Sequence, residues 1–103
     1  MTGAVIAAAT AATTSVAVAI SPNPAFGFGI DPLITSEAVT VNVATGPYAW
    51  SQINGDTMSI VNPTSQTTSF QANLTPGEPK SGTFEVSTTR GPAQVVVYLE
   101  RSF

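Results

Sequence analysis

Hydrophobic and polar residues alternate along most of this chain after residue 36. In residues 39–43 every odd position is a valine, while threonine and asparagine fill the even positions. This period of two is that of a β-strand with one buried face. Similar short runs follow at regular intervals, separated by turn-forming pairs such as Asn54-Gly55 and Pro76-Gly77. The pattern predicts an all-β sandwich.

The alternation also predicts the individual strands. Asn54-Gly55 is a strong two-residue hairpin sequence, because both residue types tolerate positive φ, so we expect residues 58–61 to return beside residues 48–52. Residues 95–99 are apolar without interruption, which predicts a strand buried on both faces, either central in a sheet or covered by the N-terminal segment. We expect strands at residues 13–20, 39–43, 48–52, 58–61, 68–72, 82–88 and 94–100.

The inward parity of these strands defines a candidate core. Tyr48 and the only tryptophan, Trp50, have the same parity on one predicted strand. We expect both to be packing residues, because tryptophan in such a sandwich commonly lies in the core; an exposed pair would instead form a platform for stacking a sugar. The predicted core residues are Val41, Trp50, Phe70, Phe84, Val86 and Val97.

The first 30 residues contain no charged side chain, and all three Lys/Arg and six Asp/Glu residues follow them. Soluble domains normally have about a quarter of their residues charged, so we expect part of this segment to be buried against a partner. A secretory signal would need basic residues at its start, and the segment has none, so we do not expect a signal peptide. A membrane span would need about 20 predominantly apolar residues, whereas this run is mostly Ala and Thr and is ended by Pro22 and Pro24.

We therefore divide the chain into an N-terminal docking segment with an extended loop at residues 1–35 and a sandwich at residues 36–103. Three prolines and two glycines in residues 21–32 predict the loop. Aromatic side chains contribute large buried areas at interfaces, so Phe26 and Phe28 are candidate docking residues with Val5 and Ile6. Two alternatives stay open: residues 13–20 are an edge strand of the sandwich, or residues 26–28 fold back as a strap across it.

Several functions are excluded by missing residue types. The chain has no Cys and no His, so it lacks thiolate nucleophiles, zinc-thiolate sites and the side chain most used in acid–base catalysis. The six carboxylates are scattered over turns and strand ends, which does not predict the facing pair of a glycosidase. With a net charge of −3, binding to a nucleic-acid backbone is not expected. We expect no enzyme activity, metal or cofactor.

Residues 48–56, 68–70 and 82–88 together resemble immunoglobulin-like domains of the polycystic-kidney-disease type. The resemblance covers residues 36–103 and implies an immunoglobulin-like antiparallel β-sandwich of about seven strands. It further implies that Trp50 packs under the strand that begins Gly82-Thr83-Phe84. The aspartate that the family often has in the following hairpin is replaced by Thr89-Arg90, which weakens the subtype but not the sandwich.

Residues 50–56 have the sequence Trp-Ser-Gln-Ile-Asn-Gly-Asp and are followed by Ser/Thr-rich and Pro-Gly turns. This sequence is similar to that of small immunoglobulin-like domains in structural proteins of tailed bacteriophages. This resemblance implies a non-enzymatic virion protein, of a tail, fibre or baseplate, with other virion proteins and copies of itself as partners. The alternatives are a capsid decoration protein and a secreted or cell-surface carbohydrate-binding module. A weak contact with host-surface glycans is a further expectation.

Overall fold

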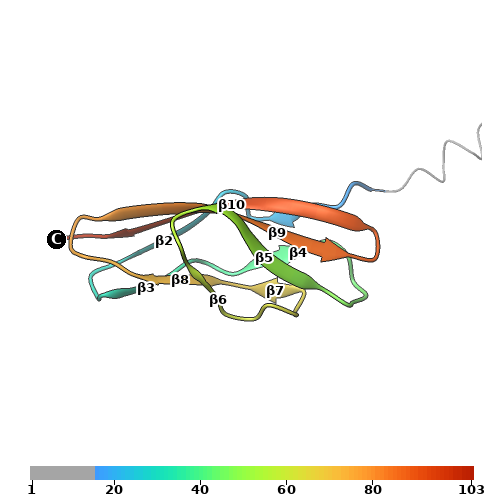
Figure 1. Cartoon of the computed structure of the whole chain (residues 1–103), viewed down its shortest axis with the longest axis horizontal. Helices are drawn as coiled ribbons and strands as arrows, with labels where there is room; N and C mark the ends of the chain where they lie inside the picture. The colour runs from blue at the N-terminus through green and yellow to red at the C-terminus, as the bar shows by residue number, and fades with distance from the viewer. Residues whose placement is uncertain (1–15) are drawn as a thin grey trace, which may run out of the picture.

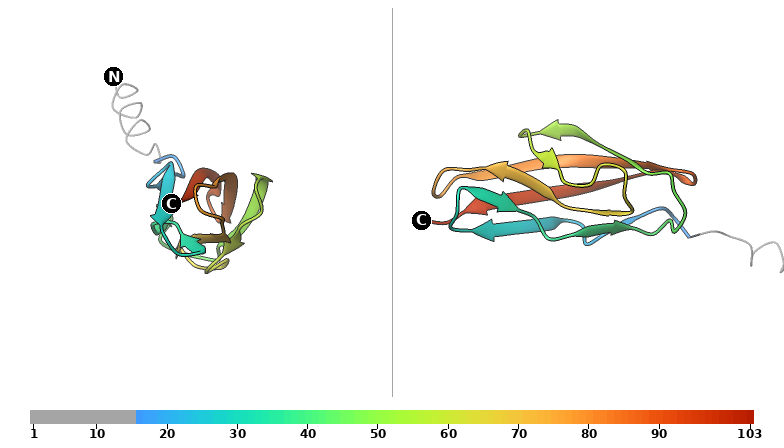
Figure 2. Two further views of the ribbon diagram at one scale, coloured as in Figure 1. Left: turned by 90° about the vertical axis from the view of Figure 1, so that its left-hand side faces the viewer. Right: turned by 90° about the horizontal axis from the view of Figure 1, so that it is seen from below.

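A computed structural model describes residues 16–103, which fold into a β-sandwich of ten strands (Figure 1). One layer is a four-stranded sheet, and the second layer consists of two three-stranded sheets (Figure 2). The first layer has the order β2 (Ala25–Gly29), β10 (Gly91–Arg101), β9 (Pro79–Thr88) and β5 (Ala49–Gly55). The all-β sandwich predicted from the alternation is confirmed.

The second layer is split because its strands are short and change partners. Only Ser69 separates β7 from β8, which pair with β4 and β3 in different sheets. One sheet has the order β1 (Ile20–Ser21), β4 (Val39–Val41) and β7 (Thr67–Thr68). The other has the order β3 (Leu33–Thr35), β8 (Phe70–Asn73) and β6 (Ser59–Ile60).

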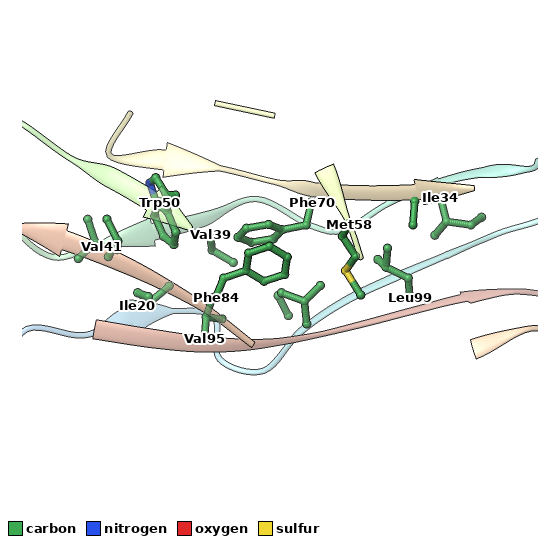
Figure 3. Close-up of a cluster of buried hydrophobic side chains, with 14 of the residues drawn as sticks. Ile20, Ile34, Val39, Val41, Trp50, Met58, Phe70, Phe84, Val95 and Leu99 are labelled. Carbon is green, nitrogen blue, oxygen red and sulfur yellow. The ribbon is translucent and has the colours of Figure 1, made fainter. Parts of the chain in front are cut away.

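The core lies between the layers and is centred on three aromatic rings (Figure 3). The Phe70 and Phe84 ring centroids are 4.1 Å apart, and Trp50 meets Phe70 edge-on at 5.9 Å. Offset and edge-to-face arrangements of this kind stabilise pairs of aromatic side chains. All six residues expected in the core are buried there: Val41, Trp50, Phe70, Phe84, Val86 and Val97.

Residues 20–35 form strands β1 to β3 of the sandwich, although residues 21–32 were expected to be an extended loop. Residues 26–28 fold back on their own sandwich, as one of the two open alternatives predicted. Among the described residues of the strand expected at 13–20, only Ile20 lies in a strand. The expected loop is wrong because its prolines lie between strands: Pro22 and Pro24 separate β1 from β2, and Pro32 precedes β3. Proline never has a backbone N–H, but it costs a ladder hydrogen bond only where it stands within a paired strand. The expected boundary after residue 35 therefore falls inside the sandwich, and Ile20 belongs to the core.

The expected hairpin at Asn54-Gly55 is also wrong. After Gly55, which has φ +93°, the chain crosses to the second layer, where β6 pairs with β8 rather than with β5. The side chain of Gln52 holds this crossing: its amide donates to the Asp56 carbonyl at 2.6 Å and its carbonyl accepts from the Met58 N–H at 3.2 Å. Of the two residues expected to adopt positive φ, only Gly55 does so, and the chain changes layers there instead of forming a hairpin.

Strand β10 is central, as expected, but its outer face is open. Val95, Val97 and Leu99 are buried, whereas Val96 is partly exposed and Tyr98 is exposed. The uninterrupted apolar run therefore does not mean burial on both faces. Its pairing with β2 is parallel, which departs from an entirely antiparallel sandwich; parallel pairing is possible because most of the chain separates the two strands.

Candidate functional site

Strand β2 points its large side chains away from the core. Ala25 and Gly27 face inward and are buried, while Phe26 and Phe28 face outward with exposed fractions of 41% and 71%. A strand of a half-buried sheet normally has its apolar residues on the inner face. In β2 this arrangement is reversed, with small residues toward the core and large apolar residues toward solvent. Both candidate docking phenylalanines therefore lie on the surface.

The inner face of β2 has room only for small residues. A Cβ atom at Gly27 would lie 2.6 Å from the Thr35 carbonyl oxygen and 2.9 Å from the Ser36 Cα. These are backbone atoms of the facing layer, which cannot move aside as a flexible side chain can. The close approach of the two layers explains why the large residues of this strand stand outside.

The outward rings form a row with one residue of the neighbouring strand. The parallel register places Tyr98 of β10 beside Phe26, with ring centroids 5.6 Å apart and planes 18° from parallel. Phe28 continues the row at 6.1 Å and 8°. With Tyr98 45% exposed, Phe26, Phe28 and Tyr98 form a continuous apolar surface, which we name the aromatic face.

The aromatic face is one wall of a groove of about 430 Å³, a volume within the range of binding pockets. The groove crosses the outer side of the four-stranded sheet at the end where β9 begins and β10 ends. Its remaining wall carries both signs of charge and is lined by Asp56, Pro79, Lys80, Ser81, Leu99 and Glu100. We call this hollow the aromatic groove.

The polar groups at the edge of the groove have partners within the fold. The Asp56 carboxylate accepts a hydrogen bond from the Ser81 N–H at 3.0 Å and so joins the end of β5 to β9. Lys80 Nζ lies 3.5 Å from the Asn73 carbonyl. Residues 16–103 contain no group of three carboxylate, histidine or cysteine residues placed to hold a metal ion. The arrangement suits non-covalent binding against an apolar wall.

The free edge of β2 is closed at Phe26 by Glu37. The Phe26 N–H donates to Glu37 Oε2, and the Phe26 carbonyl accepts from the Glu37 N–H, both at 2.9 Å. Covering edge-strand backbone groups in this way prevents another strand from pairing there. A partner at this site would therefore contact the ring surfaces rather than extend the sheet at Phe26.

Residues 16–19, the first that the structure describes, are held at the opposite end of the sheet from the aromatic groove. The Arg90 guanidinium, in the hairpin between β9 and β10, donates to the Val16 carbonyl. The Asn42 side chain donates to the Ala17 carbonyl at 2.8 Å and accepts from the Ala19 N–H at 3.0 Å. The other two expected docking residues, Val5 and Ile6, lie outside the described residues.

The aromatic pair weighed as a sugar platform is placed differently. Trp50 is only 5% exposed, and its indole N–H donates to the Ser65 carbonyl at 2.7 Å. The Tyr48 hydroxyl donates to the Val43 carbonyl at 2.6 Å. The sequence did not predict Tyr98 as a surface residue of this site, because its position beside Phe26 depends on a pairing between distant parts of the chain.

Within residues 16–103 no helix is long and apolar enough to cross a membrane. No protein-family profile and no curated protein matches the chain. The solution structure of the PKD domain from human KIAA0319 is similar, with a TM-score of 0.50 and 14% sequence identity over 86% of this chain and 91% of that chain. This likeness confirms the fold expected from the sequence: residues 16–103 form an immunoglobulin-like β-sandwich that resembles that PKD domain in architecture.

Proposed function

We propose that this chain is a non-enzymatic structural protein that docks into a larger assembly through its aromatic face. The observation that carries the proposal is the outward orientation of Phe26, Phe28 and Tyr98 beside a groove. Aromatic residues are enriched among the side chains that dominate binding energy at protein interfaces. A contiguous row of them on a folded surface marks an interaction site more strongly than scattered apolar residues do.

The size of the aromatic face indicates what kind of contact it makes. Three aromatic side chains that each bury about 150–250 Å² when covered leave roughly 300 Å² open at the exposed fractions given above. At about 25 cal/mol per Å², covering this area contributes roughly 7 kcal/mol before the losses of association, which are of similar size. The face can therefore anchor an interface that also includes further contacts.

The assembly we propose is a phage virion, with the chain in a tail, fibre or baseplate. This setting is supported by the resemblance of residues 50–56 to phage immunoglobulin-like domains and by the uncharged residues 1–30. A capsid decoration protein would use the same surface at a different place in the particle. In either setting the partners are other virion proteins and copies of this chain.

The second candidate is a carbohydrate-binding module, because near-parallel rings beside polar groove residues also suit a stacked sugar ring. Its aromatic residues would be Phe26, Phe28 and Tyr98 rather than Tyr48 and Trp50. Binding of the purified protein to a glycan array, lost on Tyr98→Ala, would favour this candidate over the structural one.

The structural proposal is tested by sedimenting particles from the source of the protein. We expect the chain to travel with the particles and a Phe26→Ser/Phe28→Ser variant to stay in the soluble fraction. Ile53→Ser is the matched control, because Ile53 is exposed on β5 of the same sheet outside the groove. Absence of the wild-type chain from every particle fraction would contradict the proposal. Immunogold labelling of intact particles separates heads from tails.

A further inference from the structure

The aromatic groove and Val16, the first described residue, lie at opposite ends of the domain. Residues 2–12, which precede Val16, are uncharged and so are chemically complementary to the apolar wall of the groove. We propose that residues 2–12 of one copy dock in the aromatic groove of the next copy, so that the chain assembles head to tail. This inference rests on the docking role proposed above and names the occupant of the groove as a second copy of this chain.

The composition of residues 2–12 fits an apolar groove. The segment contains no charge, and Val5 and Ile6 are its only large side chains, flanked by alanine, glycine and threonine. Burial of such a segment desolvates no ionised group. Val5 and Ile6 supply apolar area to meet the rings of Phe26, Phe28 and Tyr98, while the small neighbours allow close contact.

The position of Val16 favours a neighbouring groove over the chain's own groove. Val16 is held at the hairpin before Gly91, and Tyr98 lies roughly 23 Å further along β10 at about 3.3 Å per residue. Going back from Ile20, residues 16–19 run along the sandwich toward the end opposite the C-terminus (Figure 1) and are hydrogen-bonded to it by Asn42 and Arg90. The segment would have to reverse to reach its own groove, whereas a copy placed in line presents its groove ahead.

A chain segment fits the site better than the folded face of another copy. A stable interface between folded proteins buries about 800 Å² per partner, well above the roughly 300 Å² that the three rings leave open. A segment docked beside the rings can add contacts with the other groove residues. Because the segment and the groove are different surfaces, the contact is heterologous and forms rings or open chains of copies.

Mixing two full-length variants tests the pairing directly. Val5→Asp/Ile6→Asp places charge in the segment, and Phe28→Ser/Tyr98→Ser removes rings from the groove of an otherwise intact chain. In sedimentation velocity we expect the wild type to form oligomers that grow with concentration, each variant alone to be monomeric, and the mixture to form a one-to-one heterodimer. Circular dichroism and thermal unfolding check that both variants are folded.

Three results of this mixing experiment would overturn the inference. The wild type could stay monomeric across the concentration range, the mixture could form no heterodimer, or the Val5→Asp/Ile6→Asp variant could still self-associate through its aromatic face. Any of these, together with particle sedimentation that still depends on Phe28, would leave the structural proposal standing with another protein as the partner. If one of these results were found and the sedimentation of the chain with particles also did not depend on Phe28, both proposals would be overturned.

A disulfide experiment distinguishes the neighbour's groove from the chain's own groove. Because the chain has no cysteine, Ile6→Cys with Ser81→Cys creates a single pair between segment and groove. Oxidation should produce a ladder of cross-linked species in a denaturing gel. A faster-migrating monomer, cross-linked within one chain, would contradict head-to-tail assembly, as would an equal ladder from the control pair Ile6→Cys with Ile53→Cys.

Discussion

Strands β2 and β9 belong to the same sheet and alternate with the same period, yet they point their aromatic residues in opposite directions. In β9, Phe84 and Val86 face the core and Glu85 lies on the outer side. In β2, Phe26 and Phe28 are outside and Ala25 and Gly27 are inside. Alternation therefore defines a strand, whereas the distance to the facing layer decides which of its two faces belongs to the core.

That distance is set by the local architecture around Gly27. Thr35 and Ser36 pass so close to Gly27 that no side chain fits between them, and the buried Ser36 hydroxyl accepts from the Phe70 N–H at 3.0 Å, which binds this stretch to β8. Around Phe84 the layers are separated by aromatic rings. One sheet thus combines a packed aromatic residue with exposed ones.

The largest effect is a difference in unfolding free energy between substitutions of the buried Phe84 and of the exposed Phe28. Phe84→Ala should lower the free energy of unfolding by about 3–5 kcal/mol, as truncations of buried phenylalanine do. Phe28→Ala should change it by no more than about 0.5 kcal/mol, because the side chain is exposed. Urea denaturation followed by Trp50 fluorescence measures both. A similar loss for the two variants would abolish the contrast between the strands.

The next effect is expected at Gly27, where the backbone of the facing layer comes closest to β2. Gly27→Ala should destabilise the domain by about 1–3 kcal/mol, because the new Cβ meets backbone that cannot yield. Gly29→Ala is the matched control on the same strand: its nearest neighbour is the flexible end of Ile34 at 3.1 Å, and we expect a change within about 1 kcal/mol. Equal denaturation midpoints for the two variants would refute a steric cause for the inversion.

A smaller effect is expected at the free edge of β2. Glu37→Ala removes the acceptor of the Phe26 N–H and should lower stability by about 1 kcal/mol, the usual contribution of a hydrogen bond. Amide hydrogen exchange at Phe26 should accelerate. The control is Glu100→Ala, which removes an exposed carboxylate from β10 of the same sheet. Unchanged exchange at Phe26 in the Glu37 variant would show that the edge is protected in another way.

The smallest effect is a pH dependence in the turn before β9. The Thr75 N–H donates to Glu78 Oε1 at 2.7 Å and holds the pKa of the Glu78 carboxyl below its ordinary value, with further help from the Thr75 hydroxyl and Lys80. Since the folded-state pKa is the lower one, this stabilisation is present at neutral pH and is lost as the pH falls through that value. Thermal unfolding of Glu78→Gln should therefore depend less on pH at the acid end than that of the wild type. An identical acid-end dependence in both proteins would contradict this assignment.

Much of the core could be predicted from the sequence, because parity and residue size agree there. Val39 and Val41 share a buried parity with Thr40 outside, and Trp50, a large apolar residue of inward parity, is buried edge-on against Phe70. The last two strands were predicted as well, whereas the hairpin expected at Asn54-Gly55 and the loop expected at residues 21–32 were wrong. Local sequence therefore predicts the strands of the sandwich correctly where the inward-facing residues are also the large apolar residues.

The aromatic groove could be predicted only in part. Phe26 and Phe28 stood out because glycines flank them, but their direction depends on backbone from Thr35 and Ser36, and Tyr98 joins them through a parallel pairing across the chain. The path after Gly55 likewise depends on tertiary contacts of Gln52. Alternation in a single sequence carries no information on such contacts.

We propose that the aromatic face is a docking surface, and its rings take no part in the core. Hydroxyl-radical footprinting of the isolated protein and of the same protein in its assembly measures this directly for each ring. We predict that Phe28 and Tyr98 react readily in isolation and are protected in the assembly, while Phe103, fully exposed and outside the groove, reacts equally in both. Equal reactivity of Phe28 and Tyr98 in the two states would contradict the account.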